Sequence, residues 1–90
     1  MIVTKYAVPD KSHFKLCLPA GAKILTVQVL NELLRVFILV NPDNLPEKRS
    51  FRNAETGEEI SESENELAYI GSFQAKTGRP FHHIFEIIKS

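Results

Sequence analysis

The stretch ILTVQVLNELLRVFILV, residues 24–40, decides the fold, because two apolar runs flank the dipeptide Asn31-Glu32. A two-residue turn at this dipeptide predicts a β-hairpin. Its register pairs Leu30 with Leu33, Val29 with Leu34, Val27 with Val36, and Leu25 with Ile38. The turn requires a left-handed conformation at Glu32, unless a bulge lengthens the loop.

The two faces of this hairpin differ in polarity. One face carries only apolar residues, namely Leu25, Val27, Val29, Leu34, Val36 and Ile38. A slip of one residue would expose this set to water, so we expect a firm register. The other face is mixed, and either the remaining strands partly cover it or Phe37, Leu39 and Leu30 contact a second subunit.

The remaining chain reads as short strands separated by turns. Period-two alternation predicts strands at 2–8, 13–18, 47–54, 67–74 and 81–88. Residues 47–54 are polar apart from Phe51, so we expect an edge strand there. We place Tyr69, Gly71 and Phe73 on one side of their strand, and Gly71 predicts a bulge or a close backbone crossing. With the hairpin this makes about seven short, mainly antiparallel strands, in an all-β small sandwich or partly open barrel.

Length and composition bound the class of protein. Ninety residues predict a single all-β domain, residues 1–90, with one modest core. Eleven basic and eleven acidic residues give no overall bias toward nucleic acid or membrane. The lone Cys17 excludes an internal disulfide, and its reactivity has no supporting motif. With no apolar run of about 20 residues, we expect a cytoplasmic protein that does not contact membrane.

The segment 55–66 has an unusual charge. It holds six acidic residues and no basic one, which leaves eleven positive and five negative charges elsewhere. A solvated loop, a capping box over Ser61–Glu64, and a partner-recognising or DNA-mimicking surface are the readings left open.

Several landmarks together resemble a family of small phage- and prophage-encoded proteins of unknown function. They are LPAGAKILTVQV (18–29), VNPD (40–43), FRNAETGEEI (51–60), YIGSFQ (69–74) and FHHIFE (81–86). The family pattern runs LPxGAKILxVQ … YIGTFQ … FHVFE. This chain departs from it at Asn31-Glu32, where relatives often have Asn-Gly, and in the acidic run after Ile60. The resemblance implies a phage or prophage origin and a cytoplasmic accessory role, with no activity to transfer.

No motif indicates catalysis, a cofactor or a metal. His82, His83 and Glu86 form HHxxE, but adjacent strand residues point to opposite faces. His82 and Glu86 lie about 13 Å apart along a strand, too far for one ion. We therefore expect partly buried or interface histidines, no metal, no cofactor and no enzyme activity.

The best candidate site is a basic and aromatic set on the fifth strand and the last hairpin loop. It comprises Lys48, Arg49, Phe51, Arg52, Lys76 and Arg79. In a small barrel such a strand can stack bases and bind phosphates, and the alternative is a charged, solvated edge strand. We expect a non-enzymatic accessory protein acting through protein–protein contacts, as a homo-oligomer or with a protein partner. The second reading is a nucleic-acid-binding protein.

Overall fold

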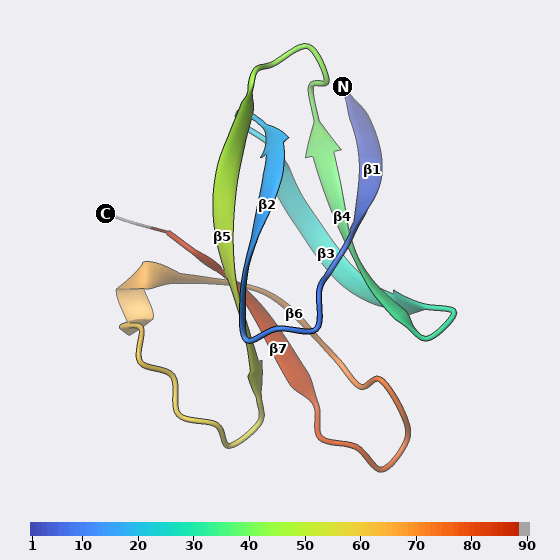
Figure 1. Cartoon of the computed structure of the whole chain (residues 1–90), viewed down its shortest axis with the longest axis vertical. Helices are drawn as coiled ribbons and strands as arrows, with labels where there is room; N and C mark the ends of the chain where they lie inside the picture. Colours follow the sequence, from blue (N-terminus) through green and yellow to red (C-terminus); the bar gives the residue numbers. More distant parts are fainter. Residues whose placement is uncertain (89–90) are drawn as a thin grey trace.

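Seven antiparallel strands form two sheets in the computed structural model, which describes residues 1–88 (Figure 1). The strands are β1 (Ile2–Ala7), β2 (His13–Pro19), β3 (Lys23–Leu30), β4 (Leu33–Val40), β5 (Pro46–Glu55), β6 (Leu67–Phe73) and β7 (His82–Ile87). One 3₁₀ turn, η1 (Glu64–Glu66), precedes β6. The predicted all-β class and the strand number are confirmed, and the arrangement is an open sandwich.

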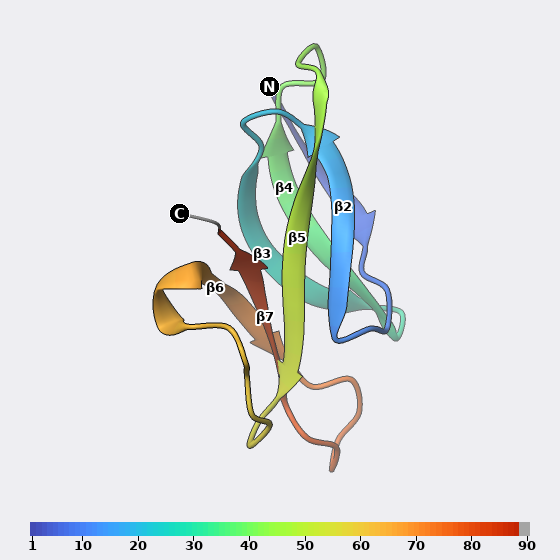
Figure 2. The same ribbon diagram turned by 60° about the vertical axis from the view of Figure 1, so that its left-hand side comes forward.

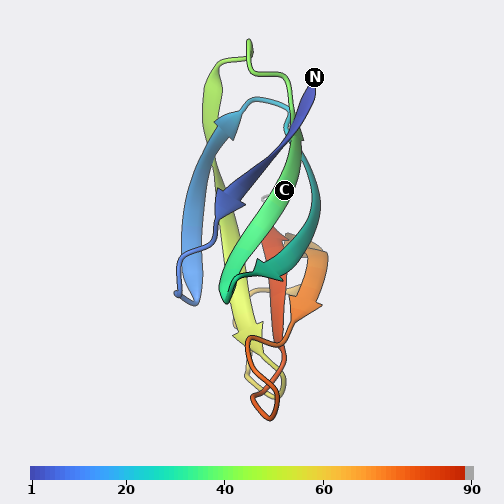
Figure 3. The ribbon, with the colours of Figure 1, turned by 90° about the vertical axis from the view of Figure 1, so that its right-hand side faces the viewer.

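The two sheets have the orders β1-β4-β3 and β2-β5-β7-β6. Figures 2 and 3 show them as two layers, with the long strand β5 crossing most of the molecule. The first half of β5 pairs with β2 and its second half pairs with β7. The prediction of an edge strand at 47–54 is therefore wrong, because β5 has a neighbour on each side. Of its polar residues, Arg52 and Asn53 are buried, whereas Glu47, Lys48 and Glu55 are exposed.

The hairpin that organises the sequence lies in the three-stranded sheet. Leu30 pairs with Leu33, and Val29 pairs with Leu34, as predicted. Asn31 and Glu32 both have positive φ, 50° and 65°, which is the two-residue turn with the expected left-handed Glu32. The pairing of Leu25 with Ile38 is wrong. A β-bulge between Ile24 and Thr26 pairs Ile24 with Ile38 and leaves Leu25 42% exposed.

The sheets approach each other most closely where β3 and β6 meet. A Cβ atom on Gly71 would lie 3.1 Å from Cγ2 of Val27 in β3, so only glycine fits without displacing Val27. The same glycine follows a bulge between Tyr69 and Gly71. Both predicted roles of Gly71 are thus confirmed. The bulge also separates Tyr69, which is 58% exposed, from Phe73, which packs on the core, so their predicted common side is wrong.

The core lies between the two sheets and draws on every layer. It contains Phe14, Leu18, Ala22, Val27, Val36, Ile38, Val40, Phe51 and Ile84. The rings of Phe14 and Phe51 stack with centroids 5.2 Å apart. In the described residues, no helix has the length and apolar character needed to span a bilayer.

Candidate functional site

The structure does not bring the six basic and aromatic candidates together on one surface. Phe51 is 1% exposed and stacks on Phe14 in the core, so its ring is not accessible to a base. Arg52 is 4% exposed. Lys48 is exposed beside Cys17, whose thiol is also exposed. Lys76 and Arg79 lie elsewhere, on the β6–β7 connection. Partner or nucleic-acid contact by this set therefore stays a prediction without a common surface.

Arg52 anchors the acidic loop, which we define as residues 56–66. Its Nη2 donates to Glu58 Oε2 at 2.8 Å, and its Nε donates to Glu62 Oε1 at 3.3 Å. Its Nη1 donates to the carbonyl oxygen of Asn53 at 2.7 Å. Arg52 points away from the core, since its cross-strand partners are His13 and Phe85. The acidic loop thus folds over the outer face of the four-stranded sheet.

The carboxylates of the acidic loop are stabilised as anions. The hydrogen bond from Arg52, followed by one from the backbone N–H of Glu55, lowers the pKa of Glu58. The hydrogen bond from His13 Nε2, at 2.9 Å, is the largest cause of the lowered pKa of Glu62. The predicted capping box lies two residues later than expected, between Ser63 and Glu66 at η1. The acidic loop is therefore a structured element.

A second, partly buried ion pair links β5 to β7 within the four-stranded sheet. Arg49 Nε donates to Glu86 Oε2 at 2.5 Å, and its Nη2 donates to Oε1 at 2.7 Å. Its Nη1 donates to the carbonyl oxygen of Ala22, just before β3. The hydrogen bond to Glu86 raises the pKa of Arg49, and partial burial opposes this. Such a bidentate contact keeps Arg49 inside the sandwich.

The adjacent histidines point to opposite faces, as predicted. His83 contacts Thr56 Oγ1 through Nε2 at 2.7 Å and Tyr69 Oη through Nδ1 at 3.1 Å. His82 faces inward, where its ring stacks on Phe73 with centroids 5.1 Å apart. Both are partly buried. Across residues 1–88, no three His, Cys, Asp or Glu side chains gather as a metal site would require.

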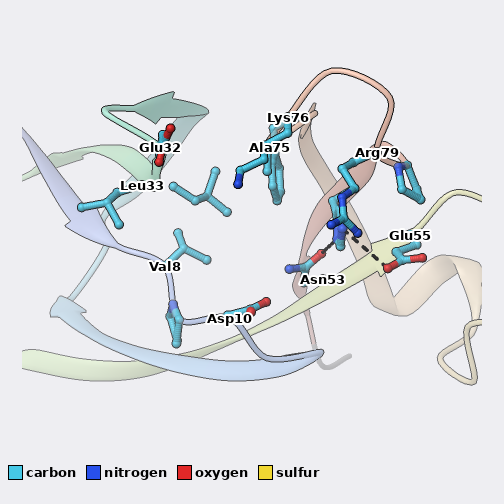
Figure 4. Close-up of a pocket in the computed structure, with 14 residues that line it drawn as sticks. Val8, Asp10, Glu32, Leu33, Asn53, Glu55, Ala75, Lys76 and Arg79 are labelled. Atoms are coloured by element: carbon cyan, nitrogen blue, oxygen red, sulfur yellow. Dashed lines mark hydrogen bonds and ion pairs between the residues drawn. The ribbon is translucent and has the colours of Figure 1, made fainter.

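A cavity of about 440 Å³ opens at one end of the sandwich, and we call it the end cavity (Figure 4). Three connections surround it: the β1–β2 loop, the β3–β4 turn and the β6–β7 loop. Its lining comprises Val8, Pro9, Asp10, Glu32, Leu33, Leu34, Asn53, Glu55, Phe73, Ala75, Lys76, Arg79, Pro80 and His82. None of these described side chains is a hydroxyl or a thiol, and the ionisable members of the lining are carboxylates, His82, Lys76 and Arg79.

Polar groups are held in fixed positions in the end cavity. His82 Nδ1 donates to Asn53 Oδ1 at 2.9 Å when the ring carries its proton there, and His82 Nε2 lies 3.7 Å from Glu55 Oε1 (Figure 4). Asn53 is buried on β5, and its hydrogen bond with His82 fixes the orientation of the imidazole ring. Lys76 and Arg79 come from the β6–β7 loop. The cavity thus combines an apolar lining with a small number of placed polar groups.

A second surface is notable for its charge. The outer face of the three-stranded sheet, which we call the basic face, carries Val3, Lys5 and Ala7 from β1, Leu33, Arg35, Phe37 and Leu39 from β4, and Lys23, Thr26, Gln28 and Leu30 from β3. Three of these side chains are basic, and none of the described residues on this face is acidic. No described segment lies over it as the acidic loop lies over the other sheet.

Sequence reasoning missed the end cavity and the basic face for different reasons. The cavity is assembled from connections far apart in the chain, and composition alone gives no signal for it. The basic face could have been found, because the period-two pattern already places Arg35, Phe37 and Leu39 on the mixed side of the hairpin. The register of β1, which adds Val3 and Lys5, was not accessible from the sequence.

Comparison with known proteins assigns a family and no activity. The family model described as "Domain of unknown function (DUF7352)" matches residues 1–90. No curated protein and no solved structure matches the chain. Since the match spans the whole sequence, the chain belongs to the DUF7352 family.

Proposed function

We propose that this DUF7352 member is a non-enzymatic binding module that holds another protein on its basic face. The resemblance of its segments 18–29 and 69–86 to small phage and prophage proteins supports a cytoplasmic accessory role.

The observation that carries the proposal is the composition of the basic face. Val3 is 59% exposed beside Leu39, and Leu33 at the far end of β4 is 53% exposed. Phe37 lies between them, paired with Lys5 on one side and Thr26 on the other. An apolar centre with a charged rim is the usual anatomy of a protein interface. A partner with an apolar centre and an acidic rim would complement it.

Charge disfavours a second copy as the occupant of the basic face. In a symmetric dimer the same patch meets itself. Lys5, Lys23 and Arg35 of one molecule would then face the same three cations of the other, and like charges across an interface are costly. A different protein that supplies carboxylates avoids this repulsion. The homo-oligomer expected from the sequence becomes an outcome of the test.

The test compares two matched double variants. Lys5→Glu with Lys23→Glu reverses two exposed charges on the basic face, and Lys15→Glu with Lys48→Glu reverses two exposed charges on the outer face of the other sheet. Proteins captured from a host lysate by wild type are identified, purified and titrated against all three forms. We expect the first variant to weaken binding about tenfold, roughly 1.4 kcal/mol, and the second to bind as wild type.

Two results would overturn the proposal. One is equal affinity of both double variants for every purified partner. The other is self-association in sedimentation experiments that the Lys5→Glu, Lys23→Glu variant abolishes, because this result assigns the face to a second copy.

Nucleic-acid binding is the second candidate, on this face instead of on β5. The specific observation is the Phe37 ring, which pairs with Lys5 and lies on the same face as Lys23 and Arg35. Aromatic rings with nearby cations bind single strands through stacking and phosphate contacts. Labelled single-stranded DNA and RNA, titrated at low and moderate salt, separate the candidates, because phosphate contacts weaken steeply as salt rises.

A further inference from the structure

We propose that the end cavity is a binding site for a small molecule with an apolar body and one carboxylate or phosphate group. The site shares Leu33 with the basic face, but its polar groups come from β5, β7 and the β6–β7 loop, which do not contribute to that face. It lies where the β6–β7 loop faces the β3–β4 turn across the open end of the sandwich (Figure 4).

The size and the walls of the end cavity fit a small apolar body. Its volume of about 440 Å³ lies in the range of small-molecule sites. Val8 from the β1–β2 connection, Leu33 and Leu34 from β4, and Phe73 from β6 supply apolar surface. An aryl or short alkyl group placed there would remove this surface from water, which is the main source of affinity for such ligands.

Two cations beside the cavity have no side-chain partner among residues 1–88. Within residues 1–88, neither the Lys76 ammonium nor the Arg79 guanidinium makes an ion pair or a side-chain hydrogen bond. Two hydrogen bonds hold the backbone of the loop that carries them. Arg79 N donates to Lys76 O at 3.1 Å, and Gln74 Nε2 donates to Arg79 O at 2.9 Å. Figure 4 shows Arg79 extending from this loop toward Asn53 and Glu55. An anion bound there would meet two cations carried on a loop whose backbone is held by hydrogen bonds.

A third donor comes from the floor of the cavity. Asn53 is 8% exposed, and its Oδ1 accepts from His82. No described residue accepts a hydrogen bond from its Nδ2. Every fully buried side-chain nitrogen and oxygen in residues 1–88 has a partner, so Nδ2 is not fully buried. The Nδ2 group is therefore open to the cavity and can donate to a ligand. A buried amide with an unused donor is the kind of polar group that fixes ligand orientation.

The remaining charges orient the ligand. Glu55 Oε1 lies 3.7 Å from His82 Nε2, which places this carboxylate beside the imidazole. Asp10 and Glu32 come from the β1–β2 and β3–β4 connections, whereas Lys76 and Arg79 come from the β6–β7 loop. The anionic group of the ligand would therefore lie toward Arg79, with the apolar body toward Leu33 and Leu34. A second anionic group at the other end would be repelled.

The experiment titrates the whole protein with three probes of similar size: phenylacetate, phenyl phosphate and benzylamine. Binding is followed by amide chemical shifts and by calorimetry. We expect both anions to bind about tenfold more tightly than benzylamine, the effect of one charge-assisted hydrogen bond. Shifts should centre on Asn53, Phe73 and the β6–β7 loop. The stronger of the two anions shows whether the site prefers a carboxylate or a phosphate.

Variants on the exposed loop keep the test independent of folding. Arg79→Gln should weaken anion binding about tenfold, and Lys76→Gln should weaken it less, since Lys is a single point charge. Lys15→Gln, on the other side of the molecule, should bind as wild type. The proposal is overturned if no anion binds at millimolar concentration, if benzylamine binds as tightly, or if Arg79→Gln leaves anion binding unchanged. The Lys5→Glu, Lys23→Glu variant should keep anion binding, so this proposal and the partner proposal fail separately.

Discussion

The outer faces of the two sheets differ in the exposure of their basic side chains. On the four-stranded sheet, Arg52 is 4% exposed beneath the acidic loop. On the three-stranded sheet, Lys5, Lys23 and Arg35 lie on a face that no described segment covers. The acidic loop covers the first face, whereas no described segment covers the second. A charged residue on a strand can therefore hold another part of the same chain or remain exposed to solvent. The residues that contact it show which of the two applies.

The covered face should be far more sensitive to substitution than the basic face. Arg52→Leu removes the cation that holds Glu58 and Glu62 and leaves backbone carbonyls without a donor. Because the Glu58 side chain is 37% exposed and screened by water, the cost comes mainly from the acceptors left without the buried guanidinium, about 2 kcal/mol. We expect a loss of this size in the free energy of unfolding, measured by urea denaturation.

Lys48→Leu is the matched control for Arg52, because Lys48 lies on the same strand and the same face but is exposed. Its effect should stay within about 0.5 kcal/mol. Equal losses for the two variants would show that the acidic loop does not depend on Arg52, and the contrast between the two sheets would disappear.

The elements that could be predicted are those specified by local pattern. The β3–β4 hairpin has period-two alternation and a turn dipeptide that tolerates positive φ, and its register at Val27, Val29 and Leu30 was predicted correctly. The bulge at Leu25 was not, because the sequence is apolar at both Ile24 and Leu25 and either can face the core. Gly71 was informative because a glycine within a strand often marks a bulge or a close approach of another chain segment.

The elements that could not be predicted depend on contacts between distant residues. Polar composition placed β5 at an edge, but Arg49 pairs with Glu86, 37 residues away, and becomes partly buried. Arg52 pairs with Glu58 and Glu62 only because the acidic loop folds back. The acidic run itself was the available signal, since six negative charges within residues 55–66 favour nearby cations. The sequence contains no such signal for the end cavity. Lys76 and Arg79 were predicted as contact residues, but the cavity that they line was not predicted.

Acid should loosen the covered face before the rest of the fold. The pKa values of Glu58 and Glu62 are lowered from the ordinary 4.5 in the folded protein. A carboxyl with a lowered folded pKa contributes stability that is present above its unfolded pKa and is lost as pH falls through its folded value. The acidic loop should therefore hold at neutral pH and detach as pH falls below about 4.5. NMR titration of the side-chain carboxyl shifts measures both groups.

His13→Gln separates the two carboxyl groups. The hydrogen bond from His13 is the largest cause of the lowered pKa of Glu62, whereas Arg52 has this role for Glu58. The variant should move the pKa of Glu62 toward 4.5 and leave that of Glu58 low. Movement of both, or of neither, would contradict the division of partners seen in the structure.

The smallest expected effect belongs to the basic face itself. Val3→Thr keeps the shape of an exposed side chain, so the free energy of unfolding should change by less than about 0.5 kcal/mol. Val36→Thr makes the same chemical change at a residue that is 1% exposed, where a hydroxyl without a partner costs about 2 kcal/mol. Both are measured by urea denaturation at low and high protein concentration. If Val3→Thr cost as much as Val36→Thr at high concentration only, Val3 would be buried against a second copy. The basic face would then be self-associating, and the carboxylate-bearing partner would have to bind elsewhere.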